Sequence, residues 1–141
     1  MEKNSILIID DDAININALM HVLESDYTVY AETEAIYCLD VVKKLCPDLI
    51  LLDVMMPEID GFKVAEILKE NEDTKKIPII FITGRDSSED EVRGFSLGAV
   101  DYIRRPVSAP VVKARVEHQL RVINNFVKIR QTATLVSNKD P

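Results

Sequence analysis

The chain has 141 residues, of which 47% are hydrophobic and 29% are charged, and its formal net charge is −7. This length and composition fit one globular domain with a sizeable core, and they exclude a fibrous or disordered chain. The acidic balance argues against broad binding of this chain to nucleic acid or to anionic membranes, since both need a basic surface.

No apolar run approaches the ~20 residues of a membrane span. Two cysteines, Cys38 and Cys46, are too few for a disulfide scaffold. We therefore expect a soluble protein of the cytoplasm.

Short apolar segments alternate along the chain with longer amphipathic ones. Each short segment is rich in Ile, Val, Leu or aromatic residues, which is typical of parallel strands that are covered on both faces. These predicted strands are, in order, 5–9, 27–31, 48–52, 77–82 and 99–103. The amphipathic segments predict helices over 13–24, 34–45, 61–71, from Ser87 or Ser88 onward, and from 108–110 to about Arg130. The alternation predicts an α/β domain with a doubly wound parallel sheet.

Several predicted helices have recognisable starts and apolar faces. Candidate caps or opening turns are Asp12 for the first helix, Thr33 for the second, Asp60-Gly61 for the third and either Ser87 or Ser88 for the fourth. The apolar face of the first helix is expected to include Ile14, and that of the second to include Ile36.

The last helix carries an apolar stripe that continues past the expected end of the domain. The stripe consists of Val112, Val116, Leu120, Ile123 and Val127. We expect a domain over 1–124, followed at 125–141 by a helical extension with a flexible, polar tail. A helix that outruns its domain is typical of a linker to another domain or of a dimer contact.

Polar side chains follow four of the predicted strands. The first strand ends at Asp10-Asp11-Asp12, the third at Asp53, the fourth at Thr83-Gly84, and the fifth at Arg104-Arg105-Pro106. In an open parallel sheet the carboxyl ends of the strands meet at one edge, where ligands bind. Clustered carboxylates repel one another, and a hard divalent cation such as Mg²⁺ relieves that repulsion.

Asp53 ends an otherwise apolar strand, DLILLD. A carboxylate placed beside a cation can act as a nucleophile toward phosphorus and form an aspartyl phosphate. In that chemistry the metal, Thr83 and a basic side chain would hold the phosphoryl oxygens.

Four sequence blocks, in this order and at these intervals, make the chain resemble the receiver domain of a two-component response regulator. The blocks are IIDDD, LLDVMMPEIDG, FITG and GAVDYIRRP, and the resemblance covers about residues 5–124. It implies a flavodoxin-like (βα)5 fold with the strand order 2-1-3-4-5. It also implies phosphoryl transfer to this chain from a sensor histidine kinase or a phosphotransfer protein.

The resemblance assigns roles to individual residues. Asp53 matches the phospho-acceptor, and Asp10 and Asp11 match the acidic pair that binds Mg²⁺ together with Asp53 and the backbone carbonyl of Met55. Such a chain is a phosphoryl acceptor with at most slow self-dephosphorylation, not an enzyme.

Two further residues match the family's switch. Thr83 matches the hydroxyl residue that turns toward the phosphoryl group, and Tyr102 matches the aromatic residue that moves with it. Output is expected through the fourth helix, fifth strand and fifth helix. The expected partners are an effector domain or partner protein, or a second copy through that face or through the last helix. Positions two beyond Asp53 and Thr83, here Met55 and Arg85, tune hydrolysis in the family.

Arg105 departs from the family pattern, which has a lysine before the proline. Arginine is longer and planar, and it is not interchangeable with lysine at a phosphoryl site. Arg105 is expected to pair with Asp53 or with a phosphoryl oxygen. We expect metal binding to survive and phosphorylation to remain possible, with the conformational response most affected.

Two other functions remain open at this point. One is a pseudo-receiver, an interaction module independent of phosphorylation, in which an Arg105–carboxylate pair holds the pocket in one state. The other is a phosphatase of the aspartyl-phosphate type, which needs a second Asp two residues after the nucleophile. Met55 stands there and argues against it.

Overall fold

Five parallel strands form a central sheet in the order β2-β1-β3-β4-β5, which confirms the expected flavodoxin-like topology. The computed structural model describes residues 3–85 and 87–139, with side chains as far as Asn125 in the last helix. The strands are β1 (Ser5–Ile9), β2 (Thr28–Glu32), β3 (Leu49–Leu52), β4 (Ile79–Thr83) and β5 (Asp101–Arg104). Each of the predicted strands is present.

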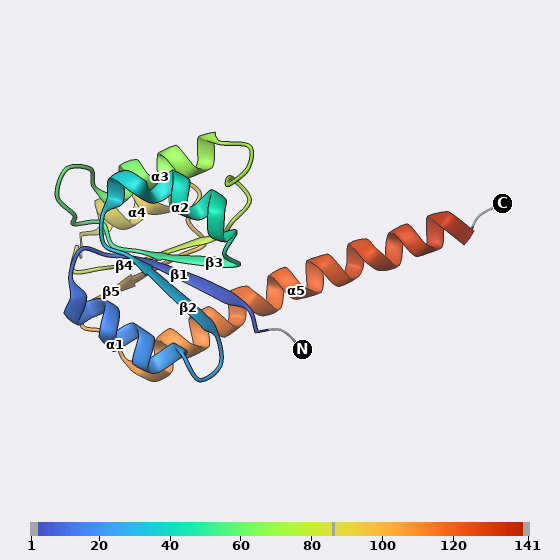
Figure 1. Cartoon of the computed structure of the whole chain (residues 1–141), viewed down its shortest axis with the longest axis horizontal. Coiled ribbons are helices and arrows are strands. Elements are labelled where there is room, and N and C mark those ends of the chain that lie inside the picture. The colour runs from blue at the N-terminus through green and yellow to red at the C-terminus, as the bar shows by residue number, and fades with distance from the viewer. Residues whose placement is uncertain (1–2, 86, 140–141) are drawn as a thin grey trace.

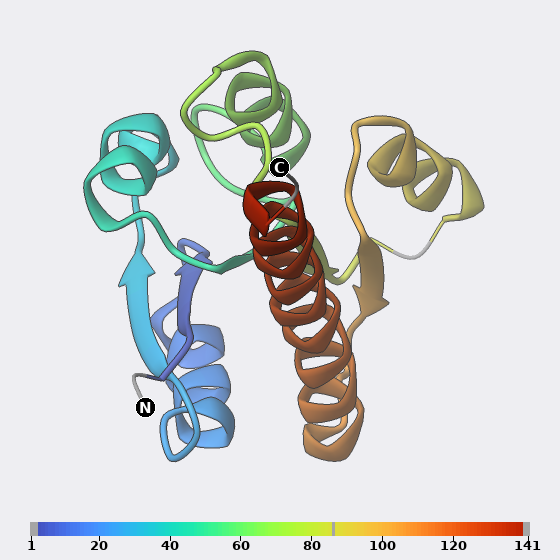
Figure 2. The same ribbon diagram turned by 90° about the vertical axis from the view of Figure 1, so that its right-hand side faces the viewer.

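Helices cover both faces of the sheet (Figures 1 and 2). One face carries α2 (Cys38–Leu45), α3 (Gly61–Glu70) and α4 (Ser88–Ser96), while α1 (Ala13–Leu23) and α5 (Ala109–Lys139) cover the other. Two hydrophobic clusters fill the space between these layers. Phe62 and Phe81 belong to the cluster under α2 and α3, and Ile8 and Val112 belong to the cluster under α1 and α5. The sheet is therefore buried on both sides, and its strand ends are the part left open.

Three predicted helix starts are confirmed by side-chain hydrogen bonds. Asp12 accepts from the amide of Ile14, Asp60 from that of Lys63, and Ser87 from that of Asp90. The predicted cap at Thr33 is wrong, because a 3₁₀ turn over Ala35–Tyr37 precedes α2 and starts after Glu34 without a side-chain cap.

The structure also corrects three expectations about burial. Ile14 and Ile36 were expected on apolar helix faces, but they are 77% and 51% exposed, and Ile16 is buried instead. The second strand was expected to be covered on both faces. As β2 it lies at the edge of the sheet, where only β1 pairs with it, and most of its residues are exposed.

The last helix is longer than predicted. α5 runs to Lys139, beyond the expected end near Arg130, and its C-terminal part projects away from the body of the domain (Figure 1). Val112, Val116 and Leu120 of the predicted apolar stripe are buried against the sheet. The side chain of Val127 and the final two residues of the expected tail lie outside the described residues.

Candidate functional site

The register of the sheet places the candidate site residues side by side. Ile9 pairs with Leu52 across β1 and β3, so Asp10 and Asp53, which follow these residues, are neighbours. In the same way Thr83 pairs with Arg104 across β4 and β5, which places Arg105 next to the end of β4. The apolar strands bring these polar residues to one edge of the sheet, as the sequence predicted.

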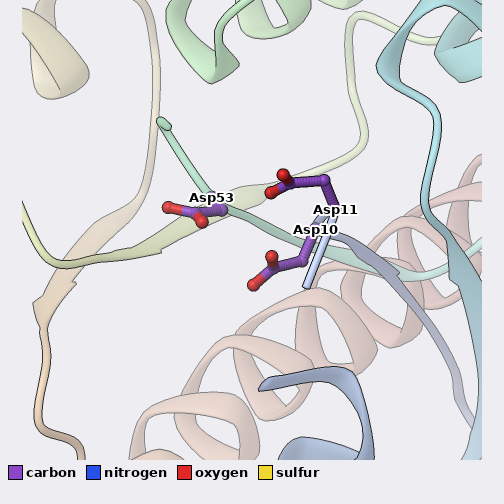
Figure 3. A group of neighbouring side chains, drawn as sticks. All are labelled: Asp10, Asp11 and Asp53. Carbon is purple, nitrogen blue, oxygen red and sulfur yellow. The ribbon is translucent and has the colours of Figure 1, made fainter. Parts of the chain in front are cut away.

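Three carboxylates meet at this edge (Figure 3). Asp10, Asp11 and Asp53 each offer one oxygen, and these oxygens all lie within 4.8 Å of one another. Asp10 and Asp53 are buried, with 1% and 6% of their surface exposed, whereas Asp11 is exposed. Hard oxygen donors at this spacing fit a divalent cation such as Mg²⁺, which binds carboxylates and retains several waters.

Each buried carboxylate accepts a backbone hydrogen bond on one oxygen and forms an ion pair with Arg105 through the other. The amide of Asp12 donates to Oδ1 of Asp10 at 2.9 Å, and the amide of Met55 donates to Oδ1 of Asp53 at 3.3 Å. The guanidinium of Arg105 reaches the other two oxygens. Its Nη2 lies 2.7 Å from Oδ2 of Asp10, and its Nη1 lies 3.3 Å from Oδ2 of Asp53. Arg105 thus supplies the countercharge that the two buried acids need.

Burial raises the pKa of the Asp10 carboxyl above its ordinary value. The negative charge of Asp53 acts in the same direction, whereas the Asp12 amide and the Arg105 guanidinium act against it. Desolvation therefore outweighs the favourable partners, so burial disfavours the ionised form of Asp10.

Thr83 and Tyr102 are linked through the backbone of Arg85. The buried hydroxyl of Thr83 accepts a hydrogen bond of 3.2 Å from the amide of Arg85, and the hydroxyl of Tyr102 donates one of 3.0 Å to its carbonyl. The ring of Tyr102 points inward and packs 5.9 Å from that of Phe81. This bridging role of the Arg85 backbone was not predicted, because nothing local in the sequence marks it.

Two glycines shape the surroundings of the site. A Cβ on Gly61 would lie 2.0 Å from the carbonyl oxygen of Asp53, so only glycine lets α3 start this close to the acceptor loop. A Cβ on Gly94 would lie 3.0 Å from the ring of Tyr102 and 3.1 Å from that of Phe81. The Asp60-Gly61 pair was predicted as a turn, and its support of Asp53 is an additional role.

A shallow hollow of about 360 Å³ lies beside the acidic cluster, of which Asp11 lines it. Asp11, Met55 and Arg85 are among the residues that line it. Met55 and Arg85 are the residues two positions beyond Asp53 and Thr83.

Comparison with known proteins gives one consistent result. The family model of the response regulator receiver domain matches residues 6–117. A Vibrio cholerae protein named "Probable cyclic di-GMP phosphodiesterase" is 42% identical over 121 residues, which are 86% of this chain and 27% of that protein. The response regulator PleD of Caulobacter vibrioides is 36% identical over 127 residues, which are 89% of this chain and 28% of PleD. The chain therefore spans only about a quarter of the length of these relatives.

Solved structures show the same likeness. A response regulator from Desulfuromonas acetoxidans superposes with a TM-score of 0.75 at 28% identity, covering 84% of this chain and 98% of the other. The BeF3-activated N-terminal receiver domain of Klebsiella pneumoniae RstA gives 0.78 at 29% identity, covering 84% and 99%. Among the described residues, no helix is both long and apolar enough to cross a membrane.

Proposed function

The chain belongs to the response regulator receiver domain family, and we propose that it accepts a phosphoryl group on Asp53 with Mg²⁺ bound. The donor is a sensor histidine kinase or a phosphotransfer protein. One observation carries the proposal: a buried carboxylate at a strand end lies within 4.8 Å of two other carboxylates and beside a guanidinium. A buried acid in such company is a candidate reactive group, because its surroundings tune its charge.

The residues divide the chemistry of transfer among them. An oxygen of Asp53 attacks phosphorus and forms a new P–O bond, while the bond from phosphorus to the donor's histidine nitrogen breaks. That nitrogen keeps the electron pair and takes up a proton. Arg105, whose Nη1 lies 3.3 Å from Oδ2 of Asp53, and Thr83, at the end of the neighbouring strand β4, would bind the oxygens of the transferred group.

Asp10, Asp11, Asp53 and the backbone carbonyl of Met55 would hold the Mg²⁺. When bound, the ion neutralises charge on the phosphoryl oxygens. The three carboxylates supply the negative charge that holds a cation at the mouth of the site, and Asp11 is the one exposed to solvent.

The switch that we propose runs from Thr83 through Arg85 to Tyr102. A hydroxyl that turns toward a phosphoryl group gives up its hydrogen bond with the Arg85 amide, which disturbs the carbonyl that holds Tyr102. Tyr102 lies on β5 against α4, and large apolar residues are exposed on α4, just before β5 and at the start of α5, namely Val92, Phe95, Val100 and Val111. The surface formed by α4, β5 and α5 is our proposed output surface. It has two conformational states, and phosphorylation shifts the population from one to the other.

An effector domain, a partner protein or a second copy of the chain would receive the output. Relatives that are three to four times longer support a parent protein with further domains. In this arrangement residues 1–124 act as the receiver, and the rest of α5 leads to the partner or forms a dimer contact.

Intact mass tests the proposal. Incubation with Mg²⁺ and acetyl phosphate should add one phosphoryl group to the chain, and Asp53→Asn should take up none. Backbone amide NMR with beryllofluoride, the activating ligand named for the RstA receiver domain, should then shift the signals of Arg85 and Tyr102. Absence of any mass addition while Mg²⁺ still binds would contradict phosphoryl transfer.

A pseudo-receiver is the second candidate function. The contacts of Arg105 with Asp10 and Asp53 favour it, because they could hold the pocket in one state without phosphorylation. In that case acetyl phosphate would leave the wild-type mass unchanged, and a partner would bind wild type and Asp53→Asn equally well.

A further inference from the structure

We propose that Arg105 competes with Mg²⁺ for the acidic site and must leave Asp10 before the metal can bind there. We call its two contacts, to Oδ2 of Asp10 and Oδ2 of Asp53, the Arg105 bridge. The inference rests on the proposed function insofar as Mg²⁺ is the ion that this site takes. In the metal-free chain the Arg105 guanidinium already contacts the carboxylate oxygens that the ion and the phosphoryl group need.

The oxygens held by the bridge are the ones that the backbone leaves available. On each of the two buried carboxylates, Oδ1 accepts from a backbone amide, of Asp12 in one case and of Met55 in the other. Oδ2 of each carboxylate is held by Arg105. The metal ligand and the nucleophile are therefore both engaged by one guanidinium.

The position of the guanidinium makes this competition strong. The side chain of Arg105 is 20% exposed, and those of Asp10 and Asp53 are 2% and 7% exposed, so the contacts are poorly screened by water. Two cations that share one carboxylate oxygen repel each other, and a charge-assisted hydrogen bond of 2.7 Å is a strong one. Binding of the ion must therefore break or weaken the contact with Asp10.

Arg105 has space to move when it is released. With Asn15, Pro106 and Val107 it lines a hollow of about 560 Å³ between α1 and the start of α5. A released guanidinium keeps its reach to Asp53, where its planar fork suits two oxygens of a phosphoryl group. Binding of the metal thus frees the Arg105 guanidinium to bind the phosphoryl group.

Replacing Arg105 with lysine tests the bridging geometry separately from the positive charge. Arg105→Lys keeps the positive charge, but a single ammonium lacks the fork that joins two carboxylates. Mg²⁺ titrations followed by the backbone amide NMR signals of Asp12 and Met55 should show about ten-fold tighter binding in Arg105→Lys than in wild type. Arg104→Lys is the matched control and should bind as wild type does, because Arg104 pairs with Glu91 on the outer face.

A direct observation on the unmodified chain completes the test. In metal-free protein the side-chain nitrogen NMR signals of Arg105 should show slowed rotation of its guanidinium group. Saturating Mg²⁺ should make this rotation faster. Unchanged Mg²⁺ affinity in Arg105→Lys, or a guanidinium that stays immobile at saturating Mg²⁺, would overturn the inference.

Failure of the proposed function would look different. Tighter Mg²⁺ binding by Arg105→Lys with no phosphoryl uptake by any variant would support the Arg105 bridge and contradict phosphoryl transfer. Phosphoryl uptake with equal Mg²⁺ affinities in wild type and Arg105→Lys would support phosphoryl transfer and contradict the competition by Arg105.

Discussion

The hydroxyl of Tyr102 donates a hydrogen bond of 3.0 Å to the backbone carbonyl of Arg85. This bond holds the ring in its inward position, against Phe81 and beside Gly94. Because the amide of Arg85 is hydrogen-bonded to Thr83, a residue of the proposed phosphoryl site and a residue of the proposed output face both contact the backbone of Arg85. Local movement at Thr83 therefore has a short physical route to Tyr102.

Tyr102→Phe removes the hydroxyl and keeps the ring. We expect the free energy of unfolding to fall by about 0.5–1.5 kcal/mol, the usual net contribution of one such hydrogen bond. Urea unfolding measures this change. Tyr30→Phe on the exposed edge strand is the control and should leave the stability as it is. An equal loss in both variants would show that the bond to Arg85 contributes nothing particular.

Alkaline pH should weaken the fold partly through Tyr102. Burial raises the pKa of its hydroxyl, and the charge of Asp90 adds to this. The native protein then keeps a proton that the unfolded chain loses, so stability declines as pH rises from about 10 through the raised native value. Tyr102→Phe should make the decline shallower without abolishing it, because burial also raises the pKa of Tyr27. Urea unfolding across this range measures the decline of stability with pH in both proteins. Equal declines in wild type and Tyr102→Phe would contradict a contribution from Tyr102.

Gly61→Ala should disturb both the stability and the acceptor loop. The new Cβ would lie 2.0 Å from the carbonyl oxygen of Asp53, so backbone atoms must shift. We expect a loss of about 1–3 kcal/mol or more in thermal or urea unfolding, together with slower phosphoryl uptake. Gly84→Ala is the matched control, since its Cβ would meet nothing within 4 Å. Wild-type stability in Gly61→Ala would contradict the close approach of α3 to Asp53.

Ser87→Ala should destabilise α4 by removing its N-cap. The hydroxyl accepts from the amide of Asp90 at 3.1 Å, and loss of such a cap costs about 1 kcal/mol. Ser88→Ala, one residue later and inside the helix, should cost far less. Urea unfolding of the two variants decides between a specific cap and a general effect of losing a serine.

Binding of Mg²⁺ should weaken on acidification earlier than ordinary aspartates would require. The ion needs ionised carboxylates, and burial raises the pKa of Asp10 above the usual 3.8. The proton therefore begins to compete with the metal while the pH is still above that value. NMR titrations with Mg²⁺ over a pH series would measure the effect. A constant affinity down to the ordinary aspartate range would show that Asp10 is not a ligand.

The sequence predicted the sheet well because its signals are local. An apolar run ending in a turn depends on a few adjacent residues, and a cap such as Ser87 depends on an amide three residues away. Errors arose where burial depends on distant elements. Ile14 and Ile36 fit the helical spacing, but neither the sheet nor a neighbouring helix covers them.

The order of strands and helices, and the gathering of Asp10, Asp53 and Thr83 at one edge, follow from the sequence, because parallel strands bring their carboxyl ends together. Tertiary structure decided which oxygens of those acids remain available. Arg105 contacts Asp10 across a separation of 95 residues, and no periodicity or motif specifies that distance. The contact depends on the length of the arginine side chain, the register between β4 and β5, and the low polarity around two buried carboxylates, which exist only once the sheet has formed.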